Sequence, residues 1–60
     1  MSDPLLLRPT EAARLLGISR SKLYELLNSG EIPTLHIGRS VRIPLAALHS
    51  WIESRLSPNV

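Results

Sequence analysis

The sequence predicts a mainly α-helical domain with one small β-hairpin, in the order helix, helix, hairpin, helix. Residues 10–28 carry two apolar stripes at helical spacing, separated by a single glycine. Residues 34–43 carry two short runs of alternating apolar residues joined at another glycine. A third helical stripe begins at residue 45, directly after a proline. Because a two-stranded hairpin is not stable alone, it must lean on the helices.

Length and composition narrow the class of protein. A chain of 60 residues is enough for one domain over 1–60 with a small core, and we expect a flexible arm at 1–4 and a tail at 57–60. The absence of cysteine excludes disulfides and thiolate metal sites. The hydrophobic content of 43% is too high for a disordered chain, and no apolar run approaches the roughly 20 residues of a membrane span. We therefore expect a cytoplasmic protein.

The first helix is expected over residues 10–16 and stops at Gly17, which can adopt a left-handed backbone angle. Its apolar stripe consists of Ala12, Ala13, Leu15 and Leu16. Its start is open, because Pro9 suits the first helical position with Arg8 as the cap, whereas Thr10 could cap instead. Upstream, at least two of the three leucines at 5–7 should pack against the body of the domain.

The second helix is expected over residues 20–28, with Ser19 as its N-cap. Leu23, Leu26 and Leu27 share one face, which leaves a polar and cationic outer face. A helix, a tight glycine turn and a capped helix with such a face predict a helix-turn-helix.

The hairpin is expected from strands at 34–37 and 41–43, joined by Gly38, Arg39 and Ser40. Alternation would place one set of side chains on the core and Arg42 on the opposite face. The expected core set is Leu35, Ile37, Val41 and Ile43.

The last helix should start with Pro44 at its first position and end before residues 57–58. Its stripe consists of Leu45, Leu48, Ile52 and Leu56, flanked by Trp51. We interpret this stripe as core, with a partner-binding face as the alternative.

Two groups of residues are candidates for contact with DNA. In the first turn of the second helix, Arg20 can pair with guanine in the major groove and Lys22 suits phosphate. Cations at a helix N-terminus oppose the helix dipole by about a few tenths of a kcal/mol, which favours an external anion as their partner. The complete helix group is Ser19, Arg20, Ser21, Lys22 and Tyr24, and the hairpin group is Arg39, Ser40 and Arg42. The alternatives are ordinary solvated residues and a plain soluble turn.

Other chemistry is disfavoured by the sequence. His36 and His49 lie in different predicted elements without acidic neighbours at ligand spacing, so no metal site is expected. The serines and the acidic residues form no catalytic arrangement, and the glycines form no phosphate-binding loop. We expect neither catalysis nor a cofactor, small-molecule substrate or membrane partner.

The run from Leu5 to Leu56 resembles the excisionase-family helix-turn-helix, a MerR-like winged-helix DNA-binding module. The motifs that carry the resemblance are LLGISRSKLY, SGEIP, IGRSVRIP and the LxxWI of Leu48–Ile52. The resemblance implies a small bacterial, phage or plasmid protein that acts as an excisionase (a recombination directionality factor) or as a transcription regulator.

The resemblance also assigns the two DNA contacts. The second helix would enter the major groove and the hairpin would act as a wing at the adjacent minor groove. A single module of this kind covers little DNA, so we expect help from self-association on adjacent sites or from an integrase. A protein-interaction module without DNA binding is the rival class.

Overall fold

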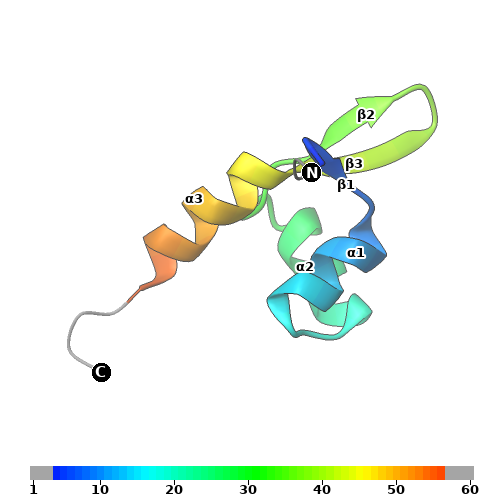
Figure 1. Cartoon of the computed structure of the whole chain (residues 1–60). Helices are drawn as coiled ribbons and strands as arrows, with labels where there is room; N and C mark the ends of the chain where they lie inside the picture. The colour runs from blue at the N-terminus through cyan, green and yellow to red at the C-terminus, as the bar shows by residue number, and fades with distance from the viewer. Residues whose placement is uncertain (1–3, 57–60) are drawn as a thin grey trace.

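The computed structural model describes residues 4–56 as three helices and a three-stranded sheet (Figure 1). The elements are β1 (Leu6–Leu7), α1 (Pro9–Leu16), α2 (Arg20–Asn28), β2 (Leu35–Ile37), β3 (Ser40–Pro44) and α3 (Leu45–Arg55). This order confirms the mainly α fold with a hairpin between the second and third helices. The predicted arm and tail fall outside the described residues, apart from Pro4. Within residues 4–56, no helix is long and apolar enough to span a membrane.

The start of α1, which the sequence left open, is at Pro9 with Arg8 as the cap residue. A guanidinium offers no hydrogen-bond acceptor, so the Arg8 side chain cannot cap the helix amides. Instead, the Arg8 amide donates to Glu11 Oε1 at 2.9 Å, which is one half of a capping box. The acidic side chain in the first turn therefore supports the helix start.

Glycine ends both α1 and α2 in the same way. Gly17 has φ 71°, and the next amide, that of Ile18, donates to the Ala13 carbonyl at 3.0 Å. Gly30 has φ 82°, and the following amide likewise reaches back to the Leu26 carbonyl, at 3.1 Å. Both are Schellman motifs, which satisfy carbonyls that a helix end would otherwise leave unpaired. The two motifs bracket α2 and fix where the chain enters and leaves it.

The sheet contains a strand that the sequence did not predict. Its order is β1-β3-β2, with both pairs antiparallel. In β1, Leu7 pairs with Ile43 and both side chains are buried. The Leu45 amide also donates to the Leu5 carbonyl at 2.9 Å, although the Leu5 side chain is 85% exposed. Two residues are too few to show an alternating pattern, which is why β1 was missed.

The hairpin register corrects the predicted core face. Ile37 pairs with Ser40, so the loop has two residues, Gly38 and Arg39, rather than three. This one-residue change moves Leu35 and Ile37 to the face that carries Arg42, because side chains alternate along a strand. Leu35 and Ile37 are 44% and 55% exposed, so their prediction as core residues was wrong. Val41 is half-buried and Ile43 is fully buried, as expected for the core face.

The third helix also differs from the prediction. Pro44 belongs to β3 and is the cap residue of α3, with ψ 133°, so the helix starts one residue later, at Leu45. Leu48 is buried in the core, but Ile52 and Leu56 are exposed, so only part of the predicted stripe is core. The buried core consists of Leu7, Ala12, Ala13, Leu23, Leu26, Ile32, Ile43 and Leu48.

Candidate nucleic-acid interface

One face of α2 is anchored in the core and the other is free to meet a ligand. Leu23 and Leu26 are buried, and Leu23 has no exposed surface. Burial of one leucine stabilises the fold by roughly 1.5–3 kcal/mol, so these residues hold α2 in a fixed orientation. The candidate side chains Arg20, Ser21, Lys22 and Tyr24 are all exposed.

The candidate residues of α2 have different local roles. Ser19 Oγ accepts a hydrogen bond from the Lys22 amide at 3.1 Å, which confirms Ser19 as the N-cap. Lys22 Nζ lies 3.7 Å from Glu25 Oε1 in an exposed ion pair. Within residues 4–56, Arg20 makes neither an ion pair nor a side-chain hydrogen bond. Its guanidinium therefore stands at the positive end of α2 with its donors open to an external acceptor.

The hairpin carries the second group of candidates. Arg39 is exposed at the two-residue tip and makes no side-chain hydrogen bond or ion pair with another described residue. Ser40 is half-buried at the start of β3. Arg42 is also half-buried, and its Nη1 donates to the Val41 carbonyl at 2.8 Å. Arg39 is thus the more available of the two guanidinium groups.

Sequence reasoning missed one feature of this hairpin. Leu35 and Ile37 share their face with Arg42, so a cationic residue and two exposed apolar side chains lie together. The short loop, with glycine at its first position, was the signal that could have revealed this register, because two-residue hairpins commonly place glycine there.

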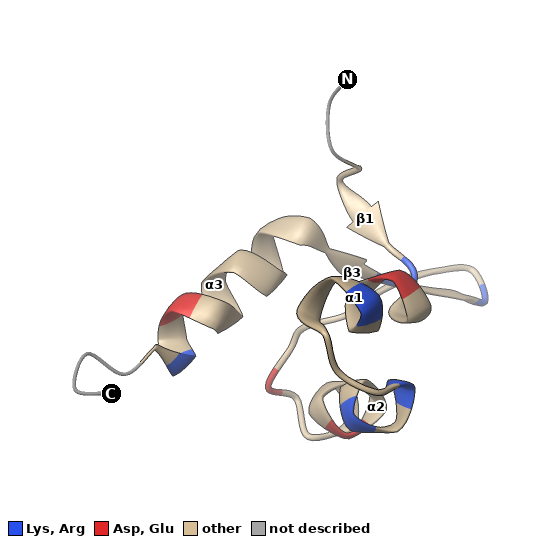
Figure 2. Cartoon of the chain, turned by 60° about the horizontal axis from the view of Figure 1, so that its bottom comes forward, with Lys and Arg blue, Asp and Glu red and all other residues tan. Residues whose placement is uncertain are grey.

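The two groups of candidates lie toward the same end of the molecule. Figure 2 shows basic residues on α2 and at the hairpin tip, both on the side away from the end of α3. Within each group the side chains are neighbours on one helix or one hairpin. No side-chain hydrogen bond or ion pair connects the two groups in residues 4–56. The arrangement offers two separate cationic contacts on one side.

The histidines do not form a site of their own. His36 lies on β2 and His49 on α3, and both are exposed. Across residues 4–56, no group of three or more His, Cys, Asp or Glu side chains is placed to hold a metal ion.

Comparison with known proteins identifies the same kind of domain as the geometry does, a helix-turn-helix. The helix-turn-helix domain family matches residues 6–56, which is nearly all of the described chain. A protein of Saccharopolyspora erythraea, named a probable excisionase, is 47% identical over 51 residues, covering 85% of this chain and 52% of that protein. A protein of Mycobacterium tuberculosis (strain H37Rv) whose name describes a DNA-binding protein is 37% identical over 49 residues, covering 82% of this chain and 63% of that one.

The chain therefore spans only about half to two thirds of the length of these relatives. No solved structure gives a significant match. The family match extends from β1 to the end of α3 and includes both glycine stops and the hairpin. This chain belongs to the helix-turn-helix domain family.

Proposed function

We propose that this protein binds double-stranded DNA sequence-specifically, with α2 in the major groove and the β2–β3 hairpin at the adjacent minor groove. The observation that carries the proposal is the division of α2 between a buried apolar face and an exposed face, at whose N-terminus Arg20 makes no ion pair or side-chain hydrogen bond with any residue of the described range 4–56. The major groove admits a helix and displays a distinct donor and acceptor pattern for each base pair. A helix presented in this way can therefore read a sequence.

Each exposed side chain has a role that fits its chemistry. Arg20 would donate two hydrogen bonds to guanine, and Lys22 would leave Glu25 to meet a phosphate. Ser21 and Tyr24 would use their hydroxyls on the DNA backbone or a base edge. In the hairpin, Arg39 would reach into the minor groove or along phosphates.

Arg42 and Ser40 complete the hairpin contact in a different way. Arg42 already donates to the Val41 carbonyl, so its guanidinium is held in place before DNA arrives. A positioned guanidinium loses less freedom on binding than a mobile one. Ser40, at the base of the loop, would offer its hydroxyl to a phosphate.

We propose the role of an excisionase, which biases a recombinase toward excision by shaping DNA. The relative from Saccharopolyspora erythraea supports this choice over a transcription regulator with the same module. In this role the protein has no catalytic activity of its own and works in the cytoplasm, with an integrase or further copies on adjacent DNA sites. Its placement in the MerR-like group is part of the same proposal.

Footprinting on DNA that flanks its own gene tests the proposal, because it reports both the site and the stoichiometry. A protected site that is lost in the Arg20→Ala variant is the expected result. A recombination assay with and without the protein then separates the excisionase from the regulator. If no duplex is bound at low salt, the rival class, a protein-interaction module, replaces DNA binding.

A further inference from the structure

The buried leucines of α2 define which residues lie at the centre of its outer face. Leu23 and Leu26 are buried, and successive residues of an α-helix are turned by about 100°. The side of the helix opposite to them therefore carries Ser21, Glu25 and Asn28. All three side chains are exposed. If α2 enters the major groove, these three side chains face the base edges more directly than those at the margins of the helix.

Glu25 is the unexpected member of this set, because it places an anion on a surface proposed to meet a polyanion. Its Oε1 lies 3.7 Å from Lys22 Nζ, and its side chain is 69% exposed. A solvent-exposed ion pair of this kind contributes little to stability. The helix dipole favours an acid in the first turn of a helix, and Glu25 lies beyond the first turn of α2. The fold therefore gains little from an acid at position 25.

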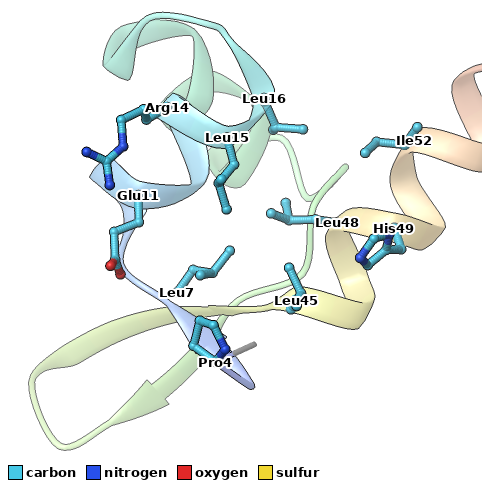
Figure 3. A pocket seen from close by; sticks show the side chains of 10 residues that line it. All are labelled: Pro4, Leu7, Glu11, Arg14, Leu15, Leu16, Leu45, Leu48, His49 and Ile52. Atoms are coloured by element: carbon cyan, nitrogen blue, oxygen red, sulfur yellow. The ribbon is translucent and has the colours of Figure 1, made fainter. Parts of the chain in front are cut away.

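Two other acidic residues of the described range have a clear structural role. Glu11, which borders the groove between α1 and α3 (Figure 3), accepts a hydrogen bond from the Arg8 amide at 2.9 Å and supports the start of α1. Glu31 Oε1 lies 3.2 Å from Arg55 Nη2, which joins the segment after α2 to α3. The Glu25 carboxylate makes no contact of either kind with residues 4–56. Its role is therefore sought outside the chain.

A carboxylate in the major groove can distinguish the four bases, because it accepts hydrogen bonds and donates none. Cytosine presents a donor there, its exocyclic N4 amine. Guanine presents two acceptors, N7 and O6, which repel a carboxylate, and thymine presents the acceptor O4 and a methyl group. Adenine presents the N6 donor beside the N7 acceptor, so it is an imperfect partner. A carboxylate on the outer face of α2 would therefore favour cytosine.

We propose that Glu25 determines sequence specificity by accepting a hydrogen bond from the N4 amine of one cytosine in the major groove. The inference rests on the proposed function, because it requires α2 to lie in that groove. Phosphates repel the carboxylate at every site, and the cytosine amine offsets this repulsion only where the right base is present. When Lys22 turns to a phosphate, the carboxylate is released for the base. Glu25 thus weakens binding to other sequences more than binding to the cognate site.

Fluorescence anisotropy on a set of duplexes tests this proposal. The footprinted site is synthesised with each base pair replaced in turn, and binding is measured for the wild type, Glu25→Gln and Glu25→Ala. In the wild type, replacement of one particular C·G pair should weaken binding about 5- to 150-fold. Glu25→Ala should lose this one preference and keep the others. Glu25→Gln should change the preference at that pair from cytosine to adenine, because an amide pairs with adenine N6 and N7.

Glu53→Gln is the matched control, since it makes the same change at an exposed position of α3 and should leave every base preference as in the wild type. If both Glu25 variants change binding by one factor on every duplex, Glu25 acts through its charge alone and the proposal is overturned, whereas DNA binding stands. A wild type that binds no duplex overturns the proposed function and this inference together. Wild-type binding to the intact site is therefore measured first, and circular dichroism checks that each variant is folded.

Discussion

Removal of the Arg39 side chain tests the hairpin contact without knowledge of the DNA target. If the four candidate cations Arg20, Lys22, Arg39 and Arg42 each neutralise one phosphate, log K falls with log salt at a slope of about −3.6. In Arg39→Ala the slope should fall to about −2.7. Raising salt from 50 to 200 mM would then weaken the wild type roughly 150-fold and the variant roughly 40-fold. Because Arg39 makes no side-chain hydrogen bond or ion pair with another described residue, its loss should leave stability nearly unchanged.

Fluorescence anisotropy with a labelled random duplex over a salt series measures these slopes. Arg55→Ala is the matched control, because it removes the same charge at the far end of α3, where Arg55 instead contacts Glu31 and Trp51. We expect the Arg55→Ala slope to equal that of the wild type. If Arg39→Ala leaves the slope unchanged, or if both variants lower it equally, the tip does not contact phosphate.

The other predictions concern α2. Leu23→Ala should destabilise the protein by about 2–5 kcal/mol, because it opens a cavity at a fully buried site. Urea denaturation should show that most of the free energy of unfolding is lost. An unchanged midpoint of urea denaturation would mean that Leu23 is not a core residue and that the orientation of α2 is wrong. Arg20→Ala should cost about 1–3 kcal/mol on the footprinted site and less on random duplex, whereas equal losses would assign Arg20 to a phosphate. Glu25→Gln should tighten random-duplex binding, since it removes an anion 3.7 Å from Lys22; weaker binding would mean that the ion pair positions Lys22.

The helices were predictable because their signals are local. A serine cap and a glycine stop act over a few residues, and Ser19, Gly17 and Gly30 each have the conformation or hydrogen bond that their type favours. The start of α1 was less clear, because Arg8 is a poor cap and Glu11 supplies the bond from three residues away. The hydrogen bond from the Arg8 amide to the Glu11 carboxylate can be identified only once the backbone conformation at the helix start is known.

The sheet was less predictable because the pairing of its strands depends on whether the hairpin loop has an even or an odd number of residues, and on partners that are distant in sequence. A hairpin loop of two residues instead of three moves every side chain of one strand to the other face, and Leu35 shows the consequence. Pairing of Leu7 with Ile43 joins residues far apart in sequence, with no local pattern to reveal it.

For the candidate site, residue types and exposure on α2 followed from helical spacing. The partners of the long side chains did not, because a flexible chain such as that of Arg42 or Lys22 chooses among many rotamers. The availability of Arg39, compared with the restrained Arg42, therefore became visible only in the structure. The sequence pattern identified the candidate cations, and the structure showed which of them are held by partners within the protein.

The separation of the two faces of α2 has a consequence for how its target preference can change. The anchoring leucines, Leu23 and Leu26, and the two Schellman stops involve none of the outward side chains at 20, 21 and 24. Randomising these three positions should yield a library in which most variants still fold. Selection from such a library against new operators would retarget the protein by surface changes alone, on an unaltered scaffold.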